Sequence, residues 1–203
     1  MALSWIKQHK LLSIFAALVT AVGIQNTIEA LTPAKEIALT IGEPWVDMQQ
    51  RSTATIGPVY EGRHWYREPD ELAYMRFADP KHGFVTPPAK FFTVNFDDEG
   101  RIDGIRMSPQ LEPLPLQEAL DIVLDLQNQW RSNGWELSDP EESPAYENNE
   151  RWKQAIENCR SSSTQWHAEP LYELAIGINC FKRDRFPKKS GYMITISMGK
   201  YNP

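Results

Sequence analysis

The sequence predicts a two-layer α+β fold, an antiparallel sheet with helices packed on one face, preceded by an N-terminal signal or anchor helix. Three observations predict it: alternating apolar segments joined by turns, a long segment with apolar residues every three or four positions, and a basic-then-apolar start. Antiparallel hairpins with grouped helices are typical of α+β proteins. With 203 residues, 41% of them hydrophobic, we expect one domain over residues 31–203 after a separate segment, residues 1–30.

The first thirty residues resemble an export signal. Lys7 and Lys10 precede an uncharged run from Leu11 to Ile24, which is short for a membrane span of roughly 20 apolar residues. Cleavage as a signal peptide and retention as an inner-membrane anchor both stay open, and a buried helix of a cytosolic protein is the alternative. Export places residue Leu31 onward outside the cytoplasm, so we expect a periplasmic domain, soluble or tethered to the inner membrane.

The first half of the domain reads as strands around one short helix. A strand over residues 37–41 stops at Gly42, and a helix follows from Pro44 to about residue 52. Aromatic-rich strands are expected over 63–67 and 72–77, with a turn at 79–83. Residues 92–96 alternate, residues 97–100 form a hairpin loop, and the return strand slips phase at Asp103-Gly104, which indicates a bulge.

The second half begins with the strongest helical pattern. Apolar residues recur over about 114–132, and Asn133-Gly134 then provides a C-terminal cap, after which Trp135 is expected to fold back. A loop over 139–149 leads to a second helix over about 148–159. Strands are expected over 164–168, 172–180 and 192–198, the last two forming a hairpin with a basic tip.

The two cysteines, Cys159 and Cys180, are expected to form a disulfide, because outside the cytoplasm two cysteines usually pair. Closing a loop of this length stabilises the fold by ~3 kcal/mol. Two unrelated buried thiols are the alternative.

The sequence lacks the patterns on which common catalytic sites depend. The four His residues have no zinc-site spacing, and neither a nucleophile elbow nor a phosphate loop occurs. Ser197 and Lys200 match S-x-x-K, but on a strand they point to opposite faces. We therefore expect no enzyme, no cofactor and no metal, and a solvated hairpin tip at residues 97–99.

Charge favours a basic protein partner over nucleic acid. The formal net charge is -6, and phosphate backbones repel such a protein. Residues 136–150 hold six acids and no Lys or Arg. Within this stretch we expect the partner contacts Glu136, Asp139, Glu141, Glu142 and Glu147; a merely solvated loop is the alternative.

A second candidate surface is the connection over residues 76–88. It combines turn residues with aromatic ones, as recognition loops do, and its candidate contacts are Asp79, Lys81, His82 and Phe84. Packing of these side chains beneath a rigid loop is the alternative.

Three runs carry a resemblance to a known class of proteins. They are RFADPKHGFVTPPAKFF, TVNFDDEGRIDGIRM and SPQLEPLPLQEALDIVLDLQNQWRSNGW, which together span Arg76 to Trp135. They resemble small exported proteins of Gram-negative bacteria, some of them immunity partners of toxins delivered by type VI secretion. The outline of helices and meander also resembles the β-lactamase inhibitor protein and a small outer-membrane assembly lipoprotein, whose lipid-bearing Cys this chain lacks. The motifs are structural, so the resemblance transfers no site residues.

These observations together predict a periplasmic protein-binding module. The resemblance implies an immunity protein that sterically neutralises a toxin, with a basic-surfaced toxin or envelope protein as partner. A cell-envelope assembly or structural factor is the alternative, and a hydrolase without a recognisable motif is a third.

Overall fold

The computed structural model describes residues 35–57, 65–67, 71–89, 91–160, 163–181 and 191–202, with the backbone alone for 65–67. All of them belong to one compact unit, Lys35–Pro203. The predicted signal or anchor segment, residues 1–30, and most of the basic hairpin tip lie outside the described residues.

The fold is α+β, as the sequence predicts. A seven-stranded sheet has the order β2-β5-β6-β10-β9-β8-β7, and a three-stranded sheet has the order β1-β3-β4. Three helices accompany them in the part of the chain that is described. The elements in chain order are β1 (Lys35–Leu39), α2 (Trp45–Arg51), β2 (Trp65–Arg67), β3 (Ala73–Phe77), β4 (Phe84–Val85), β5 (Phe91–Phe96), β6 (Ile102–Ser108), α3 (Leu116–Ser132), β7 (Glu136–Leu137), α4 (Glu150–Glu157), β8 (Thr164–Ala168), β9 (Tyr172–Phe181) and β10 (Gly191–Lys200).

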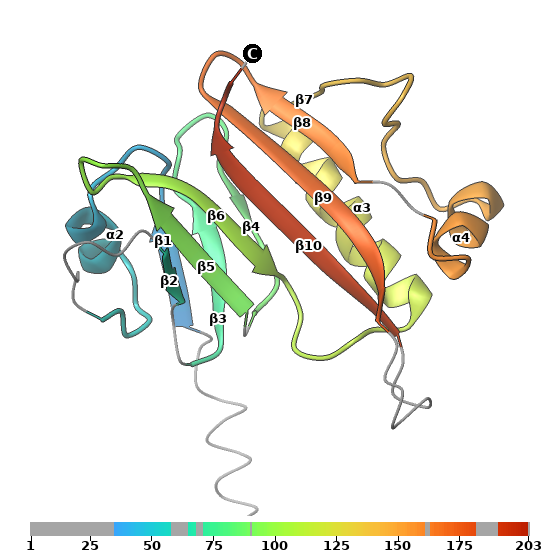
Figure 1. The fold of residues 1–203 in the computed structure, drawn as a ribbon, viewed down its shortest axis with the longest axis horizontal. Helices are drawn as coiled ribbons and strands as arrows, with labels where there is room; N and C mark the ends of the chain where they lie inside the picture. The colour runs from blue at the N-terminus through green and yellow to red at the C-terminus, as the bar shows by residue number, and fades with distance from the viewer. Residues whose placement is uncertain are drawn as a thin grey trace, which may run out of the picture. The chain divides into compact units, whose positions relative to one another are not determined.

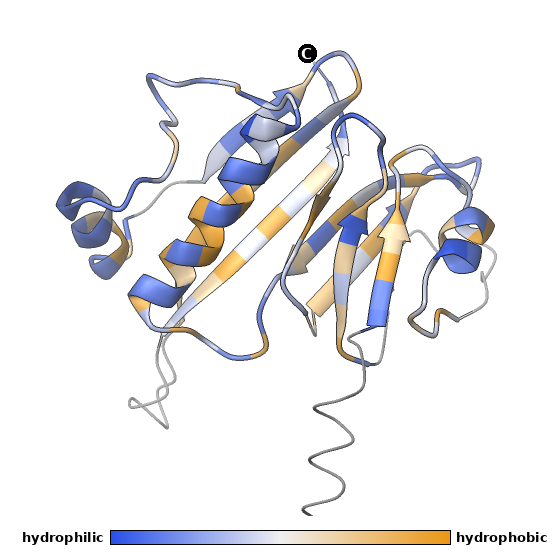
Figure 2. Ribbon diagram, turned by 180° about the vertical axis from the view of Figure 1, so that it is seen from behind, coloured by the Kyte–Doolittle hydropathy of each residue, from blue (hydrophilic) through white to orange (hydrophobic). Residues whose placement is uncertain are grey.

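The large sheet forms one layer, and α3 lies beside the small sheet in the other. In Figure 2, which is seen from behind, α3 and the strands of the small sheet lie side by side in front of the large sheet, which faces the viewer in Figure 1. The buried side chains of both sheets and of α3 form a single core cluster. We call the sheet face that packs on this core the inner face, and the opposite one the outer face.

The small sheet corrects two expectations. We expected helices alone in the second layer and a long connection over residues 76–88, whereas Phe84 and Val85 form β4, antiparallel to β3. In addition, β1 pairs with β3 in parallel, Lys35 opposite Ala73. Buried and half-buried residues alternate along β3, and the last three residues of β1 are buried, so one side of this sheet packs on the core. Short strands therefore supply the apolar surface that helices were expected to provide.

The hairpin of β5 and β6 confirms the predicted bulge. Asn95 lies opposite Gly104, but Phe96 lies opposite Ile102, so Asp103 is the extra residue. Gly100 has φ 72°, as the loop position requires.

Helix α3 also confirms its prediction. Leu120, Val123, Leu126 and Trp130 are fully buried along one face. Gly134 has φ 73°, after which the amide of Trp135 donates to the Trp130 carbonyl at 3.0 Å and its ring is buried.

Strand β10 lies at the centre of the large sheet although it is the last strand along the chain. It pairs with β9 along its whole length and with β6 only over residues 196–199. The predicted hairpin of β9 and β10 is thus confirmed. The sequence pattern did not predict β7, two residues that pair with β8 as Glu136 with His167 and Leu137 with Trp166.

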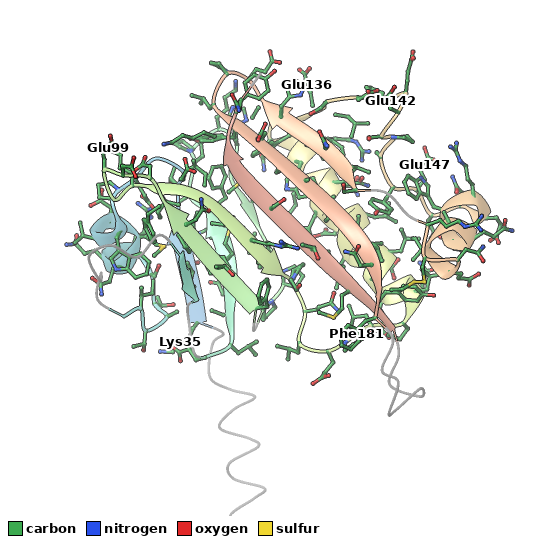
Figure 3. All side chains as sticks on the ribbon, in the orientation of Figure 1. Lys35, Glu99, Glu136, Glu142, Glu147 and Phe181 are labelled. Atoms are coloured by element: carbon green, nitrogen blue, oxygen red, sulfur yellow. A yellow bond between two sulfur atoms is a disulfide. The ribbon has the colours of Figure 1, made fainter. Side chains whose placement is uncertain are left out.

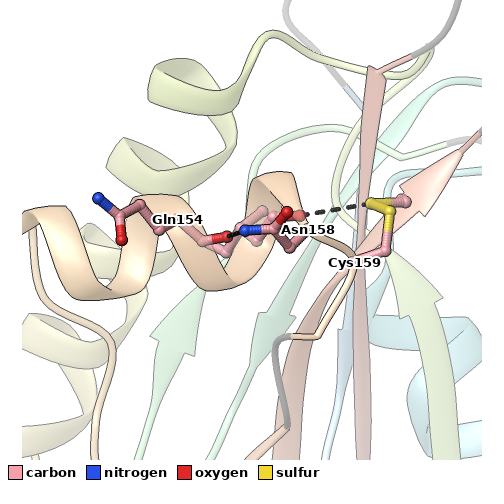
Figure 4. The surroundings of a disulfide bond; sticks show 5 residues. Gln154, Asn158 and Cys159 are labelled. Atoms are coloured by element: carbon pink, nitrogen blue, oxygen red, sulfur yellow. Dashed lines mark hydrogen bonds between the residues drawn. A yellow bond between two sulfur atoms is a disulfide. The ribbon is translucent and has the colours of Figure 1, made fainter.

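The predicted disulfide is present. Cys159, just after α4, is bonded to Cys180 near the end of β9 (Figure 4). The bond ties α4 to the large sheet, and it is consistent with an exported protein in an oxidising compartment.

Candidate functional site

The outer face of the large sheet is hollowed. A groove of about 860 Å³ crosses β6, β10, β9 and β8, and a second hollow of about 360 Å³ adjoins it over β10 and β9. Both hollows lie on the face opposite the core, because the exposed residues in their lining, such as Glu173 and Ser197, alternate with buried ones along each strand. The strands themselves therefore build this site.

Small residues form the floor of the groove. Ser197 pairs with Ala175, and Thr195 with Gly177, on the neighbouring strands β10 and β9. A Cβ atom on Gly177 would meet nothing closer than Ser163, at an ordinary 3.5 Å. The hollow therefore exists because these side chains are short, and a larger one would fill it.

Arg106 stands in the middle of this face. It lies opposite Thr93 on β5 and opposite Ser197 on β10, and its side chain is exposed. Within the described part of the chain, its guanidinium forms no ion pair or hydrogen bond. It is a cation surrounded by small polar neighbours.

One end of the groove is acidic. Glu173 lies opposite His167 across β9 and β8, and His167 lies opposite Glu136 across β8 and β7. The His167 ring contacts the Ser138 hydroxyl at 3.0 Å and a carboxylate oxygen of Glu169 at 3.7 Å. His167 thus has an acidic cross-strand neighbour on each side, Glu173 and Glu136, and a third carboxylate, that of Glu169, close to its ring.

The lysine at this end is already paired. The Lys200 ammonium lies 2.8 Å from an Asp97 carboxylate oxygen and 3.4 Å from one of Asp103. The hydrogen bond to Asp97 raises the pKa of Lys200, and the ammonium in turn lowers the pKa of Asp97 against the opposing effect of its burial. Lys200 therefore does not neutralise Glu173 or Glu136.

The acidic stretch predicted as a partner surface continues from this end. Glu136 belongs to β7, while Glu141, Glu142 and Glu147 are exposed on the loop from β7 to α4. Figure 3 shows Glu136, Glu142 and Glu147 along one margin of the described unit. Asp139 differs, because its carboxylate accepts hydrogen bonds from the amides of Glu141 and Glu142 and so shapes the loop.

A glutamine holds this loop on α3. The Gln127 side chain, fully buried, accepts from the Tyr146 amide and donates to the Tyr146 carbonyl, both at 2.9 Å. The Tyr146 hydroxyl in turn accepts from the Ile178 amide at 3.0 Å. The acidic margin is thus fixed to the helix and to β9 rather than only solvated.

The other predicted surface, residues 79–84, is mostly inside the molecule. His82 and Phe84 are each 3% exposed. The His82 ring bonds the Asn133 carbonyl at 2.8 Å, and Phe84 packs edge-on against Trp130 and Trp135. This placement gives both side chains a structural role, and only Lys81 of the four predicted contacts is well exposed.

Asp79 organises that turn. Its carboxylate accepts from the amides of Lys81 and His82, at 2.9 and 2.8 Å, and from the Tyr172 hydroxyl at 2.9 Å. Burial alone would raise the pKa of Asp79, but these three hydrogen bonds outweigh it and hold the pKa below its ordinary value. Burial, followed by the bond to Asp79, raises the pKa of Tyr172 to about 12.

Sequence reasoning did not single out the outer face. The signal was available in the outward positions of the last two strands, where Ala175, Gly177, Thr195 and Ser197 are small. An arginine in the middle of the return strand after the hairpin was a second signal. Neither signal indicates a site until β6 is known to pair with β10, and no local sequence pattern specifies that pairing.

Among the described residues, no group of three or more His, Cys, Asp or Glu side chains is placed to hold a metal ion. None of the helices in these ranges has the length and apolar character of a membrane span. Comparisons with known protein families, with curated proteins and with solved structures gave no match.

Proposed function

We propose that this protein is a periplasmic protein-binding module that holds its partner on the outer face of the large sheet. The observation that carries the proposal is the groove across β6, β10, β9 and β8, on a face opposite the core. The most specific form of the proposal is an immunity or inhibitor protein, in which the sheet and its acidic margin cover the working surface of a toxin.

The size of the face suits such a role. Strands β9 and β10 have ten residues each, which corresponds to about 33 Å, and five neighbouring strands extend about 24 Å across. The product is at most on the order of 800 Å², the area that each partner contributes to a standard interface. A rigid sheet also loses little conformational freedom on binding, which favours affinity.

The charge of the face suits a basic partner. Glu173 lines one end of the groove, Glu136 lies two strands beyond it on β7, and Glu141, Glu142 and Glu147 continue the negative surface along the margin. Such a surface attracts a positively charged protein and speeds its association, most strongly at low salt. Steric neutralisation needs no catalytic group, so the proposal includes no enzyme activity and no cofactor.

Site-specific crosslinking tests the docking face. A photo-reactive phenylalanine analogue is placed at Ser197, in the groove, and as a control at Lys153, on α4. Irradiation of cells that natively contain the protein should give one adduct of defined mass from position 197 and none of that mass from position 153. Equal adducts at both positions, or none at 197, would count against the proposed face.

Deletion of the gene separates the immunity role from envelope assembly. Loss of an immunity protein should reduce survival only when the crosslinked partner is produced. Loss of an assembly factor should weaken the envelope in every case, as measured by leakage of a periplasmic reporter enzyme. The second outcome would replace the immunity role while keeping the docking face.

A further inference from the structure

We infer that the groove recognises a loop of its protein partner that carries a carboxylate, bound by Arg106, and a basic side chain, bound by Glu173. This inference rests on the proposed function and specifies the chemistry of the partner. It combines two observations, the guanidinium of Arg106 without an ion pair and the acidic end of the same groove.

The first step is the state of Arg106. Its neighbours across the sheet are the hydroxyl residues Thr93 and Ser197, and in the described ranges no carboxylate binds its guanidinium. Lys200, the other cation lining the groove, is held by two aspartates. Arg106 is thus the cation in the groove that remains available for recognition.

The second step is the cost of covering it. A partner that occupies the groove removes water from the guanidinium, and an arginine buried without a carboxylate or equivalent acceptor is strongly unfavourable. Two hydroxyl groups cannot replace the lost water around five N–H donors. An occupant must therefore bring its own acceptor, and a carboxylate matches the planar guanidinium with two parallel hydrogen bonds.

The third step is the spacing of opposite charges. Strand β9 is two strands away from β6 in the order β6-β10-β9, and Glu173 lies two residues along β9 from the row of Arg106. With strands ~4.8 Å apart and a two-residue step of ~6.7 Å, the two Cα atoms are separated by about 12 Å. One loop with an acidic and a basic side chain a few residues apart spans that distance.

A second copy of the chain is a weaker occupant. Two copies face to face would also bring Arg106 toward Glu173, but each carries a formal net charge of -6. Long-range repulsion between equally acidic molecules opposes that pairing. The observations therefore favour a different protein, one with a predominantly basic surface around the acidic residue that reaches Arg106.

A displayed library of cyclic peptides with ten randomised positions tests the inference without a known partner. The library is selected on the protein purified after expression of the full chain, and on the variants Arg106→Gln, Glu173→Gln and Arg151→Gln. Arg151 is an exposed residue of α4, so its variant removes the same charge away from the groove. Binding of the selected peptides to a Ser197→Tyr variant reports whether they occupy the groove.

Peptides selected on the wild type and on Arg151→Gln should contain Asp or Glu together with Lys or Arg. They should bind Arg106→Gln and Ser197→Tyr at least about tenfold more weakly, as expected for a buried charged anchor. Peptides selected on Glu173→Gln should lose the preference for Lys or Arg and keep the preference for Asp or Glu.

Two results would overturn the inference. If peptides that Ser197→Tyr blocks show no acidic preference, or bind Arg106→Gln equally well, the role of Arg106 is refuted while the docking face stands. If no selected peptide is blocked by Ser197→Tyr, or if the protein is a dimer that Arg106→Gln dissociates, a partner loop in the groove is refuted. The crosslinking experiment at position 197 then decides separately whether the proposed function survives.

Discussion

Two glutamines on α3 provide a controlled measurement of what burial adds to a hydrogen bond. Gln127 and Gln129 are two residues apart, and each side chain bonds both the amide and the carbonyl of one distant residue. Gln127 clamps Tyr146, and Gln129 clamps Val85 on β4. Tyr146 is 1% exposed, whereas Val85 is 39% exposed.

The perturbation is Gln127→Ala. It removes the two buried hydrogen bonds between the Gln127 side chain and the backbone of Tyr146, at about 1–3 kcal/mol each, and it creates a small cavity. Alanine returns a few tenths of a kcal/mol through its helix propensity. We expect the free energy of unfolding to fall by about 3–5 kcal/mol. Gln129→Ala should lower it by only about 1 kcal/mol, because water can reach the freed groups of Val85.

Urea unfolding with the disulfide intact, followed by tryptophan fluorescence and far-UV circular dichroism, measures both variants. A Gln127→Leu variant keeps most of the volume and should show most of the loss seen in Gln127→Ala. The comparison separates the effect of the lost hydrogen bonds from the effect of the cavity. Equal losses for Gln127→Ala and Gln129→Ala, within about 0.5 kcal/mol, would refute the reasoning.

Four other predictions rest on the packing, the disulfide and the charges. Phe84→Ala should lower the free energy of unfolding by about 3–4 kcal/mol, because it removes a buried ring. Phe91→Ala, which removes an exposed ring, should lower it by less than about 1 kcal/mol. Similar losses for the two variants would contradict the burial of Phe84. Reducing the disulfide should lower it by ~3 kcal/mol in the same urea assay, and an unchanged midpoint would count against this estimate. Asp79→Asn should cost about 1–2 kcal/mol at pH 7. The pKa of Asp79 is lowered in the folded state, so the stability that its carboxylate contributes is complete above the unfolded pKa of ~3.9 and is lost as the pH falls through the folded pKa. A difference in the free energy of unfolding between the wild type and Asp79→Asn that stays constant down to pH 2 would refute this reasoning. In an ultraviolet titration of the folded protein, the pKa of Tyr172 should be about 12, and a Tyr172→Phe variant identifies its signal.

Local patterns predicted the elements whose causes are local. The apolar spacing around Leu120 and Val123 defines α3, and the phase slip at Asp103 defines the bulge, because each follows from neighbouring residues. The pairing of Cys159 with Cys180 was predicted from compartment and count rather than from geometry. Such features require no knowledge of which strands become neighbours.

The remaining features depend on distant partners. Nothing near Phe84 indicates that Val85 will pair with Arg76 and be clamped by Gln129, so β4 was expected to be a loop. Likewise the parallel pairing of β1 with β3 and the antiparallel pairing of β6 with β10 are fixed by the assembled core. The groove is a product of that assembly, because its floor and Arg106 come from strands far apart along the chain.

The position of β10 has a consequence for how the molecule assembles. Among the described strands of the large sheet, β10 alone joins β2, β5 and β6 on one side to β9, β8 and β7 on the other. Until residues 191–200 are in place, the chain holds two unconnected half-sheets, and the pairs that unite them extend over residues 196–199. The contact between β6 and β10 joins segments that are far apart along the chain, and contacts of high sequence separation slow folding. Amide hydrogen exchange along residues 196–199 would therefore report when the two halves become a single cooperative unit.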